Sequence, residues 1–435
     1  MSPDFEWQTE EDRSWRAPAG SAAGRRSWPG RPLFLLGVVA LALLGGGLAL
    51  ALQLRQRVQE ATADTEAQVL ASYHLVVQAA EEQDVELFRH FLSGRDPAWS
   101  EAQAALLEEG ALFDRAAFGL HWRPARAADP AKVSISLSPD LTEAEVVAEQ
   151  MFAVAIGNGL TATLPLQRTS LFRLGEDAWL YAPPQNAHSY WGGQGVHEGR
   201  LLRLAYPLRD EEVVRRLAPD LEKKLAQMCA LPDLGCPAGW HLDVRLATEA
   251  GVLAASPNPQ ASRGRLREVS LPAPTLLGLP LNEAGYQALY RAYGSALVKV
   301  AVANLVDYEC CAHYLFYQAL RDDQLAQLGL RPWPLAPADY VQIRDGLRSL
   351  EELAVLWHET EAAGKGELNQ VYAFVEFLRT DASLGWPPAA RLQRGLNTAL
   401  RFSEWLQPFA AVSLEERWPG FAAEQARRAS LPVDG

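Results

Sequence analysis

The stretch 186–198 gathers polar and aromatic side chains whose types suit metal or small-ligand binding. Three glycines within it would let the backbone fold back on itself. Two imidazoles and a carboxylate are ligands that zinc accepts, so a metal site is one interpretation. A glycine-rich linker docked by its aromatic rings is the interpretation that we favour, and we expect no metal and no cofactor. The candidate binding residues are His188, Tyr190, Trp191, His197 and Glu198.

The common catalytic motifs do not occur in the sequence. There is no His-Glu-x-x-His, which sets two zinc-binding imidazoles one helical turn apart. Glu309 and His313 share a face of a predicted helix, but two ligands do not close a zinc site, so a structural contact is favoured. His358 and Glu359 are adjacent and point to different faces. These patterns favour a protein without metal-dependent catalysis.

Nucleophile and phosphate motifs are also missing. No Gly-x-Ser-x-Gly elbow is present, and Ser295 is expected inside a helix. The sequence Gly364-Lys365-Gly366 lacks the strand and the spaced glycines of a P-loop, so we interpret it as a break between helices. Whether the protein is an enzyme stays open, with the residues favouring a non-enzyme.

The four cysteines form two close pairs. Cys229 and Cys236 bracket a short turn, and an oxidising compartment would permit a disulfide between them. Cys310 and Cys311 are neighbours in a helical pattern, which holds their side chains apart, so buried thiols are expected.

Residues 33–52 form an uncharged apolar run of 20 residues, enough for a helix to cross the lipid hydrocarbon layer of about 30 Å. Five arginines precede the run and only Arg55 and Arg57 follow it closely, which places the N-terminus in the cytoplasm. We therefore predict a single-pass protein of the cell membrane that contacts the lipid bilayer through this run. A cleaved secretory signal is the alternative, because Ala49-Leu50-Ala51 resembles a cleavage site.

The charge of the chain restricts its partners. Residues 1–32 carry five acidic residues and five arginines, so the formal net charge of −13 belongs to the region that follows the apolar run. A nucleic-acid partner is excluded, since it would require clustered Lys and Arg. An unidentified protein or small ligand outside the cell membrane is the expected partner.

The segment 54–190 combines a stalk helix, further helices and alternating strands. A helix is predicted over 55–92, with an apolar stripe that begins at Val69, and apolar runs on both sides of Gly157-Asn158-Gly159 indicate a hairpin. This order of elements, with a strand at Trp179, resembles NTF2-like domains. The resemblance implies a long helix and a curved sheet that enclose a cavity.

The segment 191–410 begins with strand, helix and strand and continues with long helices. A strand precedes a helix over 210–228, another covers 241–247, and Asn282 is expected to cap a long helix. Four further helices are predicted over 308–328, 337–362, 367–380 and 388–406. This order resembles the peptidase-MA-like (gluzincin-type) arrangement of bacterial membrane-anchored proteins, here without the zinc motif.

The expected fold class is α+β, with five regions along the chain. They are a disordered cytoplasmic arm (1–32), a transmembrane helix (33–53), an NTF2-like domain with its stalk helix (54–190), a mainly helical peptidase-MA-like domain with a small sheet (191–410) and an irregular tail (411–435). We expect an extracytoplasmic module that binds a ligand or a protein. The alternatives are a hydrolase with a non-standard site and an envelope-sensing signalling protein.

Overall fold

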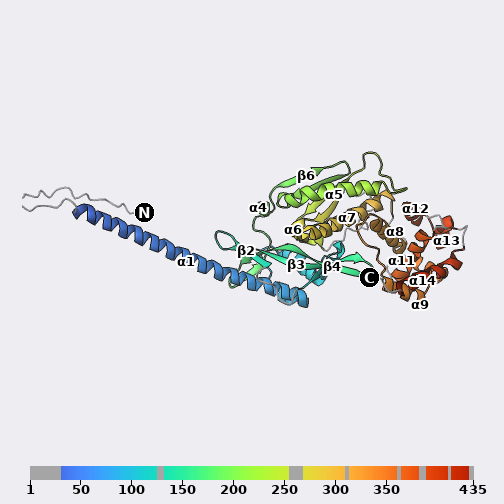
Figure 1. Cartoon of the computed structure of the whole chain (residues 1–435), viewed down its shortest axis with the longest axis horizontal. Helices are drawn as coiled ribbons and strands as arrows, with labels where there is room; N and C mark the ends of the chain where they lie inside the picture. Colours follow the sequence, from blue (N-terminus) through green and yellow to red (C-terminus); the bar gives the residue numbers. More distant parts are fainter. Residues whose placement is uncertain are drawn as a thin grey trace, which may run out of the picture. The chain divides into compact units, whose positions relative to one another are not determined.

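The computed structural model describes residues 31–124, 132–253, 268–308, 313–359, 364–381, 388–409 and 413–430, with side chains from residue 52 onward (Figure 1). Its fold is α+β, as expected: it contains two sheets and a helical C-terminal part. The predicted arm, residues 1–32, lies outside the described residues apart from the first helical positions. Cys310, Cys311 and Glu309 lie outside them as well.

Helix α1 (Arg31–Glu82) includes the predicted membrane span. The side chains of the predicted span 33–52 lie outside the described part, apart from that of Leu52. Among the residues that are described with side chains, no helix is long and apolar enough to cross a membrane. The chain divides into residues 1–64 and 65–435 as two units, and the described part of the first is the α1 segment up to Asp64.

In the second unit, α1 packs through a stripe of apolar side chains and then ends. Val69, Tyr73 and Val76 are at most 3 % exposed, which the helical spacing of the sequence predicted. The predicted helix over 55–92 is interrupted, because Gln83 adopts a positive φ of 53°. Asp84 then accepts a hydrogen bond from the Leu87 amide and begins α2 (Val85–His90).

A six-stranded sheet is built on one long hairpin, and the hairpin predicted at Gly157-Asn158-Gly159 is confirmed. All three residues have positive φ, a conformation that Gly and Asn adopt at little cost. One edge of the hairpin pairs with β1 and β2, and the other with β5 and β10. The strands are β1 (His121–Arg123), β2 (Val133–Leu137), β3 (Glu143–Gly157), β4 (Leu160–Leu174), β5 (Trp179–Tyr181) and β10 (Leu279–Pro280).

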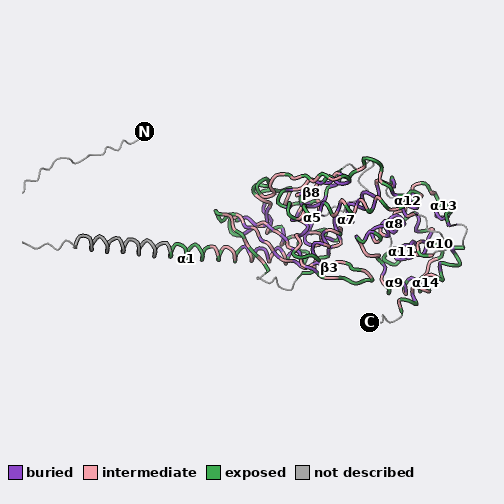
Figure 2. The backbone as a smooth tube through the Cα atoms, turned by 45° about the horizontal axis from the view of Figure 1, so that its top comes forward, coloured by how far each residue is buried: buried purple, intermediate pink, exposed green. Residues whose placement is uncertain are grey.

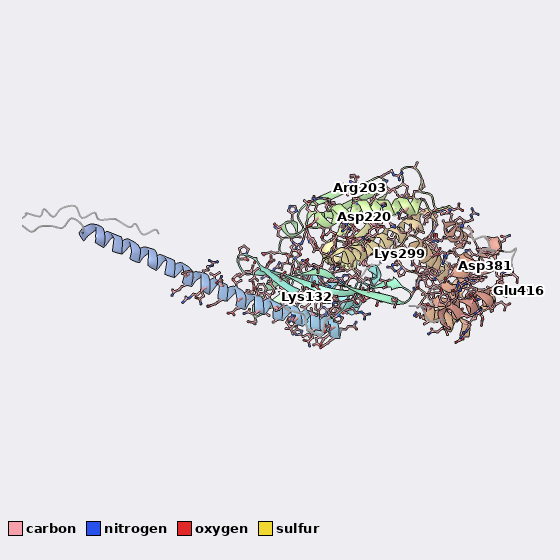
Figure 3. The ribbon with its side chains drawn as sticks, in the orientation of Figure 1. Lys132, Arg203, Asp220, Lys299, Asp381 and Glu416 are labelled. Atoms are coloured by element: carbon pink, nitrogen blue, oxygen red, sulfur yellow. A yellow bond between two sulfur atoms is a disulfide. The ribbon has the colours of Figure 1, made fainter. Side chains whose placement is uncertain are left out.

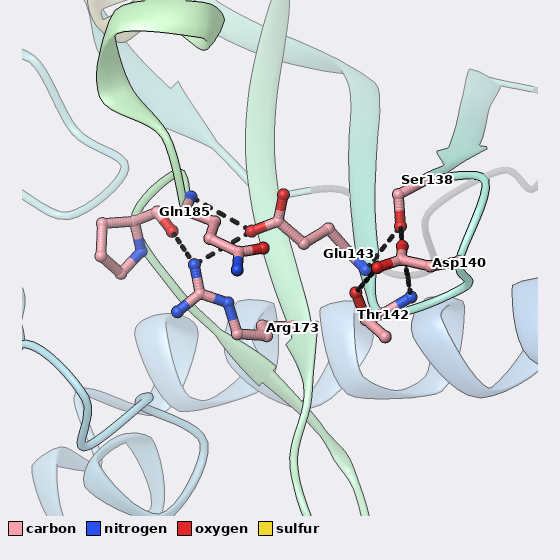
Figure 4. A network of polar contacts seen from close by, with 7 residues as sticks. Ser138, Asp140, Thr142, Glu143, Arg173 and Gln185 are labelled. Atoms are coloured by element: carbon pink, nitrogen blue, oxygen red, sulfur yellow. Dashed lines mark hydrogen bonds and ion pairs between the residues drawn. The ribbon is translucent and has the colours of Figure 1, made fainter.

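A polar network fixes the turn that leads into β3 (Figure 4). Asp140 accepts hydrogen bonds from the hydroxyls of Ser138 and Thr142, at 2.6 and 2.8 Å. These residues are exposed, so the bonds order the turn rather than contribute much to stability. Farther along, Glu143 accepts from Arg173 on β4 at 2.9 Å and from the Gln185 amide at 3.1 Å. This second group ties the chain after β5 to the sheet.

A second sheet contains β6 (Gln194–Glu198), β7 (Leu202–Pro207), β8 (Leu242–Ala247) and β9 (Glu268–Pro272), in that order. The β6–β7 pair is antiparallel, and the other two pairs are parallel. Helix α5 (Glu211–Cys229) connects β7 to β8 and continues through Pro219. The predicted disulfide is confirmed, since Cys229 at the end of α5 is bonded to Cys236.

The remaining helices are α3 (Pro97–Glu108), α4 (Ala187–Trp191), α6 (Pro274–Leu277), α7 (Glu283–Leu305), α8 (Tyr314–Gln327), α9 (Pro337–Asp345), α10 (Leu350–Val355), α11 (Lys365–Thr380), α12 (Ala389–Leu396), α13 (Phe402–Trp405) and α14 (Leu414–Ser430). Asn282 caps α7, as predicted, by accepting from the Gly285 amide at 2.9 Å. The helices expected over 337–362 and 388–406 are each divided in two. Helices α8 to α14, orange to red in Figure 1, gather at the side of the second unit that lies away from the four-stranded sheet.

The prediction of an irregular tail from residue 411 is wrong, because α14 covers Leu414–Ser430. Its buried face consists of Leu414, Trp418, Ala422 and Ala426, spaced by four residues. Pro419 and Gly420 inside this stretch weaken helix propensity and hide the pattern. Packing of the Trp418 ring against Phe374 and Phe377 of α11 overrides that propensity.

The boundary predicted at residue 190 does not separate two units. Residues 65–435 form one compact unit, and β10 from the second predicted domain pairs with β4 in the first. Phe152, Leu164 and Leu166 of the hairpin belong to the same hydrophobic core as α7 and α8. Figure 2 shows continuous buried segments at α7, α8 and α11. The hairpin is long, and its two ends bury their apolar faces in different hydrophobic cores. The order of the elements along the sequence does not reveal this division.

Candidate functional site

A pocket of about 690 Å³ lies beside the tip of the β3–β4 hairpin. This volume is typical of pockets that hold a small molecule. The hairpin forms one wall, α7 forms another, and the segments 116–121 and 330–334 close the rest together with α8 and α11. Most of the lining is apolar, and its Asp, Lys and Arg residues are Arg291 on α7, Asp322 on α8, Arg331 after α8 and Lys365 at the start of α11.

The sequence of α7 creates the space. Ala284, Ala288, Ala292 and Ser295 line the pocket and follow one another at spacings of four, four and three residues, so they share a helix face. Their side chains are too short to fill the gap to the hairpin. Farther along α7, Gly294 admits the loop after α8, since a Cβ there would lie 2.6 Å from Leu330.

The mouth of the pocket is apolar and accessible. Ile156 and Leu160 flank the Gly-Asn-Gly turn and are 52 % and 62 % exposed. Side chains alternate between the two faces of a strand, so a solvated hairpin can direct its apolar residues to the buried face. Large apolar side chains that stay exposed at its tip are therefore unusual. Trp333, from the segment after α8, also lines the pocket, and its indole donates a hydrogen bond to Glu376 at 2.9 Å.

The polar group at the pocket wall is centred on Asp322 of α8. Its carboxylate accepts from Arg321 at 3.2 Å and from the Tyr372 hydroxyl of α11 at 2.6 Å. Gln318 donates to the Tyr372 oxygen at 3.1 Å. Burial, and then the negative charge of Asp322, raise the pKa of Tyr372 well above its ordinary value, so the hydroxyl keeps its proton and acts as a donor.

Two further cations lie near this carboxylate. Arg331 lines the pocket and donates to the Ala117 carbonyl at 3.2 Å. Lys299 projects from α7 (Figure 3) and is 8 % exposed. Burial, followed by the charges of Arg331 and Arg321, lowers the pKa of Lys299 to about 7. Within the part of the chain that the structure describes, neither Lys299 nor Arg331 has a carboxylate in ion-pair range.

The predicted linker site is distributed over two regular elements. His188, Tyr190 and Trp191 belong to α4, whereas His197 and Glu198 belong to β6 and pair with β7. Trp191 packs against the core, and the Arg209 guanidinium lies 4.0 Å over the Tyr190 ring, which is the docked arrangement that we favoured. Glu198 pairs with Arg203 at 3.0 Å.

In the described ranges no three His, Cys, Asp or Glu side chains are placed to hold a metal ion. His313 stacks on Trp357 at 3.8 Å and contacts its carbonyl at 2.6 Å through Nδ1. Ser295 is inside a helix, as predicted, and its hydroxyl reaches the Leu330 carbonyl at 3.4 Å.

Where the curved sheet faces α1, its concave side carries buried polar groups. Arg168 of β4 is 6 % exposed, and its guanidinium lies 4.1 Å over the Phe113 ring. Gln150 donates to the Tyr73 hydroxyl at 3.2 Å. Burial lowers the pKa of Arg168 and of its neighbour Arg115. The proximity of two buried cations is costly for the fold.

The pocket residues Asp322, Arg331 and Tyr372, and the buried Lys299 behind the pocket wall, were not predicted from the sequence. A signal for Lys299 was present, because it is the one charged residue in the apolar run Ala296-Leu297-Val298-Lys299-Val300-Ala301-Val302. A lysine is rarely buried without a partner, so a lysine within an apolar helical run is a signal of a special role. The other three lie 23 to 73 positions away along the chain, and only the packing of α7, α8 and α11 brings them together.

Comparison of the chain with protein-family models, with curated proteins and with solved structures finds no match.

Proposed function

We propose that the protein is a membrane-anchored, extracytoplasmic binding module that holds a largely apolar small molecule without transforming it. The observation that carries this proposal is the pocket of about 690 Å³ between the hairpin tip and α7, with its exposed apolar mouth. Pockets of this size and lining are the usual sites of small-ligand binding. In the described residues Gln318, Tyr372 and Asp322 are hydrogen-bonded to one another, and these three form no nucleophile–base pair.

The membrane location rests on the sequence. The apolar run 33–52 and the arginines before it support a single-pass anchor with the N-terminus in the cytoplasm. The disulfide between Cys229 and Cys236 supports an oxidising compartment for the remainder. Resistance of the protein to extraction by alkaline carbonate, and cleavage of its C-terminal part by protease added to intact spheroplasts, are the expected results. Recovery in the soluble fraction would refute this location.

The family resemblances are part of the same proposal. A helix against a curved sheet supports an NTF2-like relationship for 54–190, and strand-helix-strand followed by stacked helices supports a peptidase-MA-like one for 191–410. In this interpretation the ligand site lies where the two regions share a core, and the zinc motif has no counterpart. A solved structure of either family that superposes on these elements with the same strand order would support the relationship.

Binding is tested with the full chain in lipid nanodiscs and a neutral probe, 1-dodecanol, in equilibrium dialysis against empty discs. One saturable site per chain is expected. Ala288→Phe places a ring in the pocket and should abolish that site, because Ala288 is on its wall and only 7 % exposed. The matched control is Ala187→Phe at an exposed position on α4, which should bind normally. Equal binding by both variants would refute the pocket as the site.

A further inference from the structure

We propose that the ligand of this pocket is an amphipathic anion, with its apolar chain against α7 and the hairpin and its single negative group on Arg331. The inference rests on the proposed function and assigns the chemical class of the ligand. It follows from the distribution of charge around the pocket, which differs from that of the whole chain.

Cations outnumber carboxylates on the pocket wall. Arg291, Arg331 and Lys365 line it, and Lys365 is paired with Asp339, outside the lining, at 3.2 Å. Asp322 is the one Asp or Glu among the lining residues that the structure describes. The chain as a whole has a formal charge of −13. A wall with this excess of positive charge in a strongly acidic protein will attract an anion and exclude a cation.

The carboxylate of Asp322 is already engaged. Arg321 donates two hydrogen bonds to one of its oxygens, both at 3.2 Å, and Tyr372 donates to the other at 2.6 Å. The Arg321–Asp322 pair is buried, with side chains 9 % and 12 % exposed. Asp322 is therefore paired directly with Arg321, whereas Arg331 has no carboxylate in ion-pair range in the described part of the chain and interacts with Asp322 only from farther away.

Arg331 is placed to receive an anion. One terminal nitrogen donates to the Ala117 carbonyl, and the remaining N–H groups have no acceptor among the described residues. A guanidinium presents five donors in a plane, which matches the oxygens of a carboxylate, sulfonate or phosphate. The surrounding apolar lining lowers the local dielectric and strengthens such a contact relative to bulk water.

Lys299 adds to the positive potential from behind the wall. It is 8 % exposed on α7, one turn beyond Ser295, which lines the pocket. Arg331, Arg321 and Asp322 are the charged groups that face it from the neighbouring elements. A bound anion near Arg331 would favour the protonated form of Lys299, so binding and proton uptake would be linked.

The test compares two probes of equal chain length, 1-dodecanesulfonate and 1-dodecanol, with the full chain in nanodiscs at pH 6.5 and moderate salt. The sulfonate stays ionised at this pH and is used below its micelle concentration. We expect it to bind about tenfold more tightly or better than the alcohol, as a charged hydrogen bond in a low dielectric predicts. Arg331→Met should remove that preference while leaving dodecanol binding intact. Retained dodecanol binding would also show that the pocket of the variant is folded.

Lys299→Met is the second variant and should reduce the preference for the sulfonate in part. The control Arg215→Met removes one exposed positive charge on α5, from a residue that does not line the pocket. It should leave the affinities for both probes unchanged. Equal affinity of the wild type for both probes would overturn the inference while the proposed binding function stands. Binding of neither probe would refute the proposed function itself. A preference that persists in both Arg331→Met and Lys299→Met would place the anion elsewhere and overturn the assignment.

Discussion

Substitution of Lys299 by Met should make the protein more stable at neutral and acidic pH and change how its stability depends on pH. Lys299 is buried on α7, and its pKa is lowered from 10.5 to about 7 by burial and by Arg331 and Arg321. Below pH 7 the lysine is protonated in both states, and the folded protein carries the full cost of a buried charge. Met has a similar length and no charge, so it removes that cost.

The size of the effect follows from the two pKa values. They differ by about 3.5, and each pKa unit corresponds to about 1.4 kcal/mol, which sets an upper value of about 5 kcal/mol. Between pH 7 and 10.5 the unfolded chain binds more protons than the folded one, so wild-type stability rises with pH by up to about 1.4 kcal/mol per pH unit. The advantage of Lys299→Met is therefore largest below pH 7 and decreases as the pH is raised.

Urea unfolding followed by tryptophan fluorescence at pH 6.5, 8.0 and 9.5 measures this difference. From pH 8.0 to 9.5 the free energy of unfolding of the variant relative to the wild type should fall by about 2 kcal/mol. Lys223→Met, at an exposed position on α5, is the control and should show no such change. A constant difference between wild type and Lys299→Met across the three pH values would refute the argument that this lysine is buried as an unpaired charge.

Three further predictions concern the stability of the fold, each measured by urea unfolding. Replacing Cys229 and Cys236 by Ala should cost about 2.5 kcal/mol, from the entropy of a loop with a sequence separation of 7, and reductant should destabilise only the wild type. Arg168→Met should stabilise by about 1–3 kcal/mol, because it removes a buried cation that lies over the Phe113 ring and has no carboxylate in ion-pair range among the described residues; destabilisation would show that the guanidinium is compensated. Trp418→Ala should cost about 3–5 kcal/mol, since this ring is 1 % exposed, whereas an irregular tail would tolerate the change.

Several elements were predictable because their signals are local. The Gly157-Asn158-Gly159 turn, the Asn282 cap and the Cys229–Cys236 disulfide each depend on residues within a short stretch. Strands and helices with a clear period of 2 or 3.6 residues were located for the same reason. The prediction of an irregular tail was wrong because Pro419 and Gly420 interrupt the helical pattern of the sequence. The stabilising contacts of Trp418 come from α11, which is distant in the chain.

The amino-acid sequence by itself determined the α+β class, most of the individual elements and the acidic character of the chain. The tertiary structure decided that the two predicted domains share a core and that Asp322, Arg331 and Tyr372 meet beside Ala288 and Ser295. Local periodicity specifies which face of each element is buried, but several arrangements can bury the same faces. The choice among them depends on side-chain packing between residues far apart in the chain, and a pocket exists only after that choice is made.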